Sequence, residues 1–449
     1  MLLFTEMKLK AFVTGAPASG SGKTTLTLAL ARAFCDKGLA VAPFKVGPDY
    51  IDPGFLAKAA RRPCYNLDLW MCGKDGLRRS FSRGACFANI AVIEGAMGLF
   101  DGPLGKTPSS TAEVAKALKI PVLLVLSAKG AAQTLAALAL GLKEYDPALK
   151  IAGAVITEVA SSRQEAMIAQ AFSQSGIKLY GFFPRLKDFI IPRRHLGLVL
   201  AEEISDEMFE TLGKEAAKNI DLEGLIQDLP EIELENSATN KPFQKARIAV
   251  AQDRAFCFYY QENLALLEEY GAELVFFSLL KDDLPEAQGY YFGGGYPELF
   301  ARALAEKKAL HKELKARVQK GVPILAECGG FMFLNRLLKL ENSAYPLVGI
   351  LPGEVVLGKK LKALGYRTLL PEENNFLGRG PFFGHEFRYS SLKNGFQKGF
   401  KAFDAEEKEV KAFGLVKENI FATYIHLHFG RTPQAAANFV AYASQVTYN

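Results

Sequence analysis

The sequence predicts an α/β protein of two domains, each with a mostly parallel sheet flanked by helices. The chain has 449 residues, and at roughly 100 to 200 residues per domain it should hold two or three domains. In both halves, short β-rich runs alternate with helical stretches, the pattern of parallel strands covered by helices. A polar seam separates the two halves.

The seam is the stretch "LPEIELENSATNKPFQKA", Leu229 to Ala246. Apolar periodicity lapses there into Glu, Asn, Ser, Lys and Pro, and a new β-rich run, "RIAVA", begins at Arg247. Such a composition is typical of a connection between domains. We therefore predict a first domain over 1–232, a linker over 233–245 and a second domain over 246–449.

The predicted strands are short apolar runs bounded by Gly, Pro or polar residues. In the first half they are 8–14, 41–45, 90–94, 121–127 and 151–157. A helix is expected to begin at Lys23 and end near Gly38. In the second half the strands are 247–251, 273–277, 289–292 and 323–326, with two later ones at 347–351 and 420–424.

Composition limits the classes of function. The net charge is +6, but the 54 Lys and Arg are interleaved with 48 Asp and Glu. This pattern favours a solvated surface and an anionic small-molecule substrate over nucleic acid. Six scattered cysteines without a C-x-x-C pair, and five histidines, argue against a disulfide framework or a zinc site and fit a reducing cytoplasm. No run of eighteen apolar residues and no signal-peptide pattern is present, so we expect neither export nor membrane insertion.

A phosphate-binding loop, or P-loop, is predicted at "VTGAPASGSGKTTLTLALARAF". A strand leads into a Gly-rich turn and then a helix, so that backbone N–H groups and the helix N-terminus cradle phosphates. Lysine then meets the terminal phosphate oxygens, and a hydroxyl reaches Mg²⁺. The nucleotide-binding candidates are Ser19, Gly20, Ser21, Gly22, Lys23, Thr24 and Thr25. Pro17 stands where the motif usually has its first glycine, and the alternative is a Gly-rich turn with an incidental lysine.

Carboxylates follow the next two predicted strands. The loop "FKVGPDYIDPGF" contributes Lys45, Asp49, Tyr50 and Asp52, and "VIEGAMGLFDG" contributes Glu94. Loops at the carboxyl ends of neighbouring parallel strands converge on one ligand crevice. Because Mg²⁺ prefers hard oxygen ligands, Thr24, Asp49 and Glu94 are its candidate ligands. The alternatives are that Asp52, which precedes a proline, only shapes a turn and that Glu94 is structural.

Cys328 lies in "VPILAECGGFMFL", between a predicted strand and a predicted helix. Such a turn would expose the sulfur, and the helix N-terminus would lower its pKa, as a thiolate nucleophile requires. Backbone N–H groups of Gly329 and of Gly294 or Gly295 in "YYFGGGYPELF" could form an oxyanion hole. In "FATYIHLHFG", His426 is the candidate base, and the spacing predicts His428 on the same strand face. An inert core cysteine is the alternative.

The second half resembles the class I glutamine amidotransferase domain in its triad-less form, and the first half resembles dethiobiotin synthetase. Taken whole, the chain resembles the cobyrinate a,c-diamide synthase family. The motifs of this chain that match the family are "ASGSGKTT", "KVGPDYIDP", "NLDLWM", "EGAMGLFDG", "PRRHLGL", "GGGYPE", "ECGGFM", "LGYR", "GHEFRYS" and "YIHLHF". They run from the P-loop almost to the C-terminus, and their order and spacing make the resemblance specific.

The resemblance implies glutamine- and ATP-dependent amidation of the a and c carboxylates of a cobalt corrinoid, a polycarboxylate. Cys328 would attack the glutamine amide, with His426 as base, and release ammonia through a thioester. The first domain would phosphorylate a substrate carboxylate, and ammonia would displace the phosphate. Asp49, Tyr50 and Asp52 would lie near the acyl phosphate. A homodimer, Mg²⁺ as cofactor and a cytoplasmic setting complete what the resemblance implies.

Several residues depart from the family pattern. His428 stands where a glutamate normally orients the base, Thr157 and Gln164 occupy positions where other residues are common, and Arg388 replaces a frequent histidine. Arg388 could serve a polycarboxylate substrate or lie on the surface. Hydrogenobyrinate or nickel sirohydrochlorin are alternative substrates for the same chemistry. A nucleotide switch or scaffold with a non-catalytic amidotransferase half is the alternative from another class.

Overall fold

The computed structural model describes residues 9–102, 109–185, 201–234 and 245–447. Most of the predicted linker 233–245, and the motif "PRRHLGL", therefore lie outside the described residues. The chain divides into two compact units, Met1–Ser237 and Ala238–Asn449. The domain limits 1–232 and 246–449 stay a prediction.

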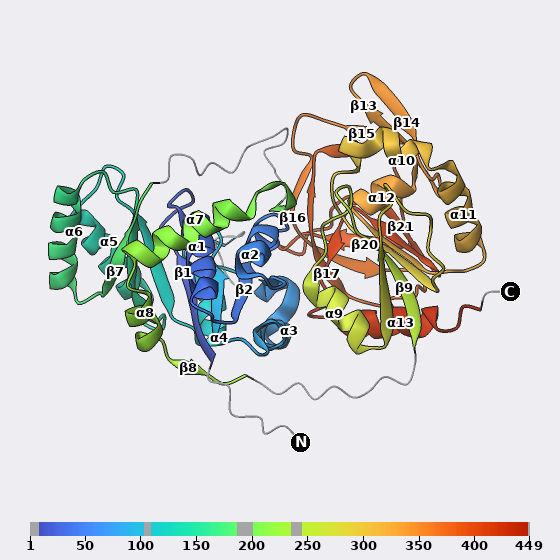
Figure 1. Cartoon of the computed structure of the whole chain (residues 1–449). Helices are drawn as coiled ribbons and strands as arrows, with labels where there is room; N and C mark the ends of the chain where they lie inside the picture. Colours follow the sequence, from blue (N-terminus) through green and yellow to red (C-terminus); the bar gives the residue numbers. More distant parts are fainter. Residues whose placement is uncertain (1–8, 103–108, 186–200, 235–244, 448–449) are drawn as a thin grey trace. The chain divides into compact units, whose positions relative to one another are not determined.

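The first unit is built on an eight-stranded sheet of order β3-β2-β4-β1-β5-β6-β7, with β8 added beside β1 (Figure 1). Its strands are β1 (Leu9–Gly15), β2 (Val41–Val46), β3 (Tyr65–Leu67), β4 (Ile90–Glu94), β5 (Val122–Ser127), β6 (Ile151–Thr157), β7 (Leu179–Phe183) and β8 (Glu231–Ile232). All pairs are parallel except β1 with β8. The order places the carboxyl ends of β2, β4 and β1 side by side.

Helices cover both faces of this sheet. They are α1 (Lys23–Asp36), α2 (Asp52–Ala60), α3 (Leu69–Ala85), α4 (Thr111–Leu118), α5 (Thr134–Tyr145), α6 (Ser162–Ser175), α7 (Asp206–Asn219) and α8 (Leu222–Asp228). Helices α3 to α6 pack in one apolar core, and α1, α2, α7 and α8 pack in the other. Buried Arg32 of α1 forms ion pairs with Asp206 and Glu210 of α7, which ties these two helices together.

The second unit contains a seven-stranded sheet of order β10-β9-β11-β12-β22-β21-β19. Its strands are β9 (Ala246–Ala251), β10 (Ala272–Phe277), β11 (Gly289–Phe292), β12 (Ile324–Glu327), β19 (Gln397–Lys398), β21 (Gly414–Lys417) and β22 (Ile420–Thr423). The run from β10 to β22 is parallel, and β21 with β22 is antiparallel. The parallel part is the sheet that the sequence predicts.

Two four-stranded sheets, β14-β13-β15-β18 and β20-β16-β17-β23, are additions that the sequence did not predict. Their strands are β13 (Asn335–Leu340), β14 (Ser343–Pro346), β15 (Leu351–Leu357), β16 (Ala363–Pro371), β17 (Phe382–Arg388), β18 (Ser390–Lys393), β20 (Phe400–Phe403) and β23 (His426–Leu427). The predicted strand 347–351 is wrong, because β15 begins only at Leu351. The strands of these two sheets are half-exposed, and all of their pairs except β13 with β15 are antiparallel. Such strands lack the continuous apolar runs by which buried parallel strands are recognised.

Helices also pack on both sides of the main sheet of this unit. They are α9 (Gln261–Glu269), the 3₁₀ turn η3 (Pro297–Phe300), α10 (Ala301–Glu306), α11 (Lys308–Gln319), α12 (Gly329–Leu334) and α13 (Gln434–Ala443). Helices α9 and α13 share one core, and α10, α11 and α12 share the other. The short α12 directly follows the central strand β12.

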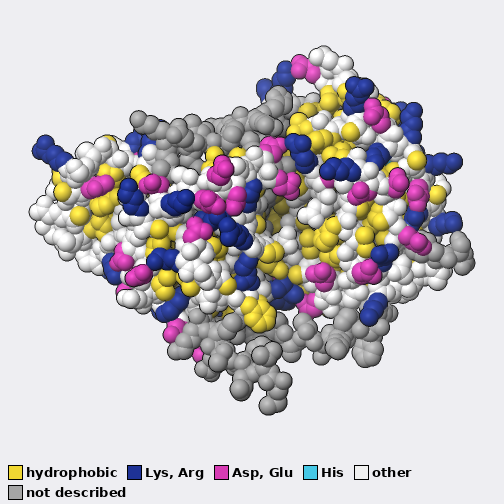
Figure 2. Space-filling model, viewed as in Figure 1, with side chains coloured by type: hydrophobic (Ala, Val, Ile, Leu, Met, Phe, Trp, Pro, Cys, Tyr) yellow, Lys and Arg dark blue, Asp and Glu magenta, His cyan; other side chains and the backbone are white. Residues whose placement is uncertain are grey.

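The predicted fold class is confirmed. Apart from 347–351, each predicted strand begins and ends within one residue of an observed strand, as far as the described residues reach. In the part of the chain that the structure describes, no helix is long and apolar enough to cross a membrane. Figure 2 shows acidic and basic side chains interspersed over the visible face.

Candidate functional site

The P-loop connects β1 to α1, and a side chain at the carboxyl end of β6 holds it in place. Gly20 and Gly22 adopt φ values of +83° and +82°, a region that costs glycine little and strains other residues. Thr157 Oγ1 donates a hydrogen bond to the Ser21 carbonyl at 2.9 Å. Thr157, which the sequence marks only as a departure from the family pattern, thus anchors the loop. Gln164 supports the neighbouring turn, since its Nε2 donates to the Ala128 carbonyl at 2.8 Å.

Lys23 lies buried at the start of α1. Its Nζ donates to the carbonyl of Met97 at 2.5 Å and to that of Ala18 at 3.4 Å. Burial, followed by the nearby charge of Lys45, lowers the pKa of Lys23. An anionic ligand in this loop would compensate both effects, which is what a phosphate-binding lysine requires.

Three side chains lie in one row across the carboxyl ends of β2, β4 and β1. Lys45 pairs in register with Glu94, and Glu94 pairs with Thr14. Thr24 Oγ1 donates to Glu94 Oε1 at 2.5 Å, while Glu94 Oε2 has no hydrogen-bond partner among the described residues. Burial raises the pKa of Glu94. The structure therefore brings together two predicted metal ligands, Thr24 and Glu94, around a buried oxygen with spare capacity.

Lys45 is the counter-charge of this cluster. Its Nζ lies 3.6 Å from Asp52 Oδ2, 3.9 Å from Asp49 Oδ2 and 4.0 Å from Glu94 Oε1. Burial alone would lower the pKa of Lys45, but the three carboxylates outweigh it and raise the pKa to about 12. Burial and the neighbouring carboxylates raise the pKa of Asp52 to about 8. The sequence analysis gives Lys45 as a residue of this loop but predicts no role for it. Its place beside Glu94 depends on the register between β2 and β4, which the sequence does not show.

The loop that carries Asp49 and Tyr50 is fixed by backbone contacts. Asp49 Oδ1 accepts hydrogen bonds from the N–H groups of Ile51 and Asp52, at 2.8 and 3.2 Å, just before α2. Asn66 Nδ2 donates to the carbonyls of Gly47 and Asp49 at 2.9 and 2.7 Å. Asn66 is a supporting residue that the sequence analysis missed. Tyr50 lies half-buried between Asp49 and the start of α2.

Thr24 and Glu94 fit a Mg²⁺ ion that is also bound by the phosphate oxygens of a nucleotide. In the described ranges, no group of three His, Cys, Asp or Glu side chains is placed to hold a metal alone. Mg²⁺ keeps several waters and usually takes only one or two carboxylates together with phosphate oxygens. The Thr24 hydroxyl and the unpartnered Glu94 oxygen match that requirement, whereas the second oxygen of Asp49 lies beside Lys45.

In the second unit, Cys328 occupies a strained turn between β12 and α12. Its backbone has φ +48° and ψ −101°, and its N–H donates to the Thr423 carbonyl at 2.9 Å. A non-glycine residue held in such a conformation is typical of a functional site. The expected exposure and lowered pKa are wrong, however. The residue is only 9% exposed, and burial, followed by the charge of Glu298, raises the pKa of Cys328 to about 12.

The glycine loop after β11 lies against this turn and against His426. Gly330 N–H donates to the Gly293 carbonyl at 2.8 Å. A methyl group added at Gly329 would stand 3.0 Å from Gly295 N, and one at Gly294 would stand 2.2 Å from His426 Cε1. The loop thus brings Gly295 beside Gly329, the residue after Cys328, and Gly294 beside His426. The Gly294 N–H donates to the Phe258 carbonyl at 3.2 Å, so this predicted oxyanion-hole donor is already engaged.

His426 is buried on β23 and pairs in register with His385 of β17. Burial, with a smaller contribution from His385, lowers the pKa of His426 to about 3. The imidazole is therefore neutral near pH 7. A neutral imidazole can accept a proton, but a general base works best with a pKa near the working pH, so His426 at this pKa is a weak base for the thiol.

His428 directly follows β23, and its N–H donates to the Phe383 carbonyl of β17 at 2.8 Å. That His426 and His428 share one strand face stays a prediction. The Nδ1 of His428 accepts a hydrogen bond from Gly430 N–H at 3.0 Å, and its ring centroid lies 4.7 Å from that of Tyr260. These contacts assign the proton of a neutral His428 to Nε2. They also fix the ring in the core of the unit.

Two residues that the sequence analysis missed clamp the backbone next to His426. Glu327 Oε1 accepts from Leu427 N–H at 2.9 Å. Asn263 Nδ2 donates to the Leu427 carbonyl at 2.8 Å, and its Oδ1 accepts from Phe429 N–H at 2.7 Å. Tyr291 OH donates to Glu327 Oε2 at 2.9 Å. We call Glu327 and Asn263 the His426 clamp.

Arg388 is not a surface residue. Its side chain is 9% exposed, and its Nε donates to Glu386 Oε1 at 2.7 Å. Glu386 also accepts from Arg367 Nε at 2.9 Å, and the Arg388 guanidinium lies 4.8 Å from the Tyr424 ring centroid. The surface alternative for Arg388 is therefore wrong.

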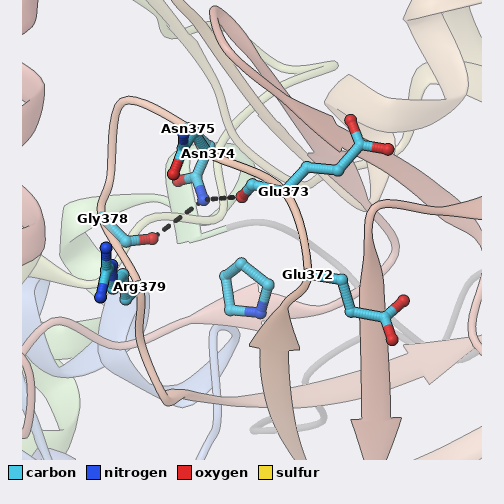
Figure 3. Close-up of a pocket in the computed structure, with 7 residues that line it drawn as sticks. Glu372, Glu373, Asn374, Asn375, Gly378 and Arg379 are labelled. Carbon is cyan, nitrogen blue, oxygen red and sulfur yellow. Dashed lines mark hydrogen bonds between the residues drawn. The ribbon is translucent and has the colours of Figure 1, made fainter.

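An open cavity of about 330 Å³ lies in the loop between β16 and β17. Its lining residues are Pro371, Glu372, Glu373, Asn374, Asn375, Gly378 and Arg379 (Figure 3). Asn375 Nδ2 holds the loop by donating to the carbonyls of Gly378 and Glu373, at 2.9 and 3.3 Å. None of the predicted site residues lines this cavity.

Comparison with known families matches each unit separately. Residues 12–199 match the family described as the CobQ/CobB/MinD/ParA nucleotide binding domain. Residues 247–434 match the CobB/CobQ-like glutamine amidotransferase domain. These two matches cover the P-loop and the Cys328 cluster, respectively.

Curated relatives match over nearly the full chain. The cobyrinate a,c-diamide synthase of Leptospira interrogans is 39% identical over 449 residues, covering 97% of this chain and 98% of the relative. Those of Dehalococcoides mccartyi and Picrophilus torridus are each 38% identical, covering 97% of this chain and 98% and 99% of the relatives. The chain belongs to the cobyrinate a,c-diamide synthase family, the glutamine-dependent amidating ligases that join a nucleotide-binding domain to a glutamine amidotransferase domain.

Proposed function

We propose that this enzyme uses ATP and glutamine to convert cobyrinate into cobyrinate a,c-diamide during cobalamin biosynthesis. The observation that carries the proposal is that one chain holds a P-loop beside buried carboxylates and, in its other unit, a cysteine gathered with glycines and a neutral histidine. One site suits the activation of a carboxylate, and the other suits the release of ammonia. The printed name of the full-length relatives supports the choice of substrate.

In the second unit, Cys328 Sγ attacks the side-chain amide carbon of glutamine. His426 takes the thiol proton during the attack and returns it to the leaving ammonia. Because burial raises the thiol pKa to about 12, proton transfer must accompany the attack instead of preceding it. The N–H groups of Gly329 and Gly295 stabilise the oxyanion, because the Gly294 N–H already donates to the Phe258 carbonyl. Water then hydrolyses the thioester to glutamate.

In the first unit, the segment from Ser19 to Thr25 holds the phosphates of ATP. A substrate carboxylate oxygen attacks the γ-phosphorus, ADP leaves, and an acyl phosphate forms. Ammonia attacks its carbonyl carbon and displaces phosphate, which leaves with the proton that ammonia loses, and Asp52 lies toward the incoming ammonia. Lys23 balances charge on the phosphates, and Asp49 and Tyr50 face the acyl group.

Mg²⁺ is the proposed cofactor. When bound, it would neutralise phosphate charge in the nucleotide site. The Thr24 hydroxyl and Glu94 would hold it, with Asp49 in the surrounding shell. We further propose that the enzyme works as a homodimer in the cytoplasm, with neither nucleic acid nor a membrane as partner.

The choice of ring is tested by a substrate panel. Purified enzyme is incubated with ATP, Mg²⁺ and glutamine together with cobyrinate, hydrogenobyrinate or nickel sirohydrochlorin, and rates are followed by mass spectrometry. The highest kcat/KM is expected for cobyrinate. A higher value for either other ring would reassign the substrate within the same chemistry.

Substituting Gly294 by alanine is expected to damage only the glutamine reaction. The new methyl group would meet His426 Cε1 at 2.2 Å, so either the imidazole or the loop must move. A displacement of about 1 Å can cost roughly 100-fold in rate. Glutamine hydrolysis should fall by about that factor, while amidation with added ammonia should continue. Gly141→Ala is the control, since a methyl there meets no atom within 4 Å.

Substituting Asn263 by aspartate should weaken the His426 clamp. Aspartate can still accept from Phe429 N–H, but it cannot donate to the Leu427 carbonyl. Leaving a buried carbonyl unsatisfied costs about 1–3 kcal/mol, so the melting temperature and the kcat for glutamine should both fall. Glu327→Gln should cause the smaller loss, because an amide can still accept from Leu427 N–H. Equal kcat values in wild type and Asn263→Asp would refute the clamp.

A further inference from the structure

Of the two donors predicted in the glycine loop, the Gly295 N–H is the one that is available. It lies beside Gly329, since a methyl group there would stand 3.0 Å from the Gly295 nitrogen. In the described part of the chain, the Gly295 N–H donates to no other group. Gly295 has a φ of +150°, and a methyl group on it would meet the Ala255 carbonyl oxygen at 2.2 Å. The direction of this N–H therefore depends on how its neighbours in the loop are held.

The neighbours are held by residues 252–260, which follow β9. Tyr296 N–H donates to the Ala255 carbonyl at 2.9 Å, and Gly294 N–H donates to the Phe258 carbonyl at 3.2 Å. These contacts join backbone groups, so a side-chain substitution does not remove them cleanly. A side chain supplies the contact at the start of the loop.

The hydroxyl of Tyr259 fixes the first residue of the glycine loop. It accepts a hydrogen bond from Gly293 N–H at 2.8 Å and donates one to the Ala251 carbonyl at the end of β9. Tyr259 is only 9% exposed, and its ring lies edge-on to that of Tyr291, with the two centroids 5.0 Å apart. The hydroxyl thus joins the end of β9 to the start of the loop from a buried and packed position.

Gly293 lies directly against the Tyr259 ring. A methyl group at Gly293 would stand 2.5 Å from Tyr259 Cζ, so the loop packs this closely only because the residue is a glycine. The Gly293 carbonyl accepts a hydrogen bond from Gly330 N–H of α12 at 2.8 Å. One peptide group of Gly293 is therefore held by Tyr259 and the other by the helix that follows Cys328. The loop cannot shift without breaking one of these contacts.

We propose that Tyr259 is a positioning residue that keeps the Gly295 N–H directed at the oxyanion formed when Cys328 attacks glutamine. This inference rests on the proposed hydrolysis of glutamine at Cys328. A donor is most effective when its direction is set before the reaction, because it then needs no reorganisation as charge develops. Without the hydroxyl, the Gly293 N–H and the Ala251 carbonyl lose their shared partner, and the loop can settle into other arrangements. Tyr259 acts in this scheme through the loop.

The test compares wild type with Tyr259→Phe and with the matched control Tyr290→Phe. Tyr290 is buried in β11, and its hydroxyl donates to the Pro285 carbonyl at 2.9 Å, so the control also removes one hydroxyl from the core of this unit. Three quantities are measured for each protein: the kcat and the KM for glutamine hydrolysis, and the inhibition constant of glutamate γ-semialdehyde. The aldehyde carbon of this inhibitor adds the sulfur of Cys328, and its oxygen then takes the place of the oxyanion.

We expect the kcat of Tyr259→Phe to fall roughly 10- to 100-fold, because the donor is displaced but not removed. The KM should stay close to that of wild type, since the oxyanion forms only after glutamine is bound. The inhibition constant of glutamate γ-semialdehyde should rise by a factor similar to the fall in kcat. Tyr290→Phe should keep the wild-type values of all three quantities, even where its melting temperature falls as far as that of Tyr259→Phe.

The proposal is overturned if the kcat of Tyr259→Phe equals that of Tyr290→Phe, or if the inhibition constant of the aldehyde does not change. Rates are compared below the melting transition of both variants, so that loss of folded protein does not imitate loss of the donor. Amidation with added ammonia should equal that of wild type in both. Failure of the underlying function would look different. Wild-type enzyme would then release no ammonia from glutamine, or Cys328→Ala would release it equally well.

Discussion

Replacing Cys328 by alanine is expected to abolish amidation supported by glutamine and to preserve amidation supported by ammonia. The substitution removes the sulfur that forms the thioester but adds no bulk to the buried turn between β12 and α12. Loss of a covalent nucleophile typically costs at least about a thousandfold in rate. The two rates are measured on the same substrate with glutamine or with an ammonium salt as the nitrogen source.

Cys86→Ala is the matched control, since Cys86 is a free, half-buried cysteine in the first unit. It should retain both rates. Glutamine hydrolysis that persists in Cys328→Ala would remove Cys328 from the role of nucleophile. Loss of the ammonia-supported rate in the same variant would show that the two reactions are not divided between the units as proposed.

Replacing Lys23 by alanine is expected to abolish amidation with either nitrogen source. The Lys23 ammonium is the buried cation that Ala18 and Met97 hold within the P-loop, and without it the charge that develops on the transferred phosphoryl group is not balanced. A loss of at least about a thousandfold is expected, by analogy with other charge-stabilising groups in phosphoryl transfer. Product amides and released ADP are measured together.

Lys37→Ala is the control for this substitution. Lys37 lies just past the other end of α1, where it forms an exposed ion pair with Glu223. Its removal should leave the amidation rate nearly unchanged. Glutamine hydrolysis should survive in Lys23→Ala. Amidation that continues with ammonia in Lys23→Ala would show that the nucleotide site is misidentified.

The parts of the two sites that lie within one short segment could be predicted from the sequence. The P-loop and the turn at Cys328 are each specified by glycines next to a strand and a helix, so their local order reveals their geometry. Contacts between segments could not be predicted. Lys45 meets Glu94 only through the register of β2 and β4, and Asn263 reaches Leu427 across 164 positions of sequence.

The electrostatic environment of the site residues could not be predicted from the sequence either. Cys328 precedes a helix, and its pKa would fall if it were exposed, but the packing around it reverses the direction. Arg388 reads as a surface residue until Glu386 and Tyr424 are placed around it. The fold shows the same limit. Buried parallel strands could be predicted from their continuous apolar runs, whereas the half-exposed strands of the two smaller sheets in the second unit could not.

We propose that glutamine supplies the nitrogen of both new amides in cobyrinate a,c-diamide. It is tested most directly by incubating the wild-type enzyme with cobyrinate, ATP, Mg²⁺ and glutamine labelled with ¹⁵N at the side-chain amide, and by determining the mass of the product. We predict a corrinoid with two new amides that both carry ¹⁵N. A product with no new amide, with four new amides, or with two amides that lack the label would show that the enzyme does not make cobyrinate a,c-diamide from glutamine.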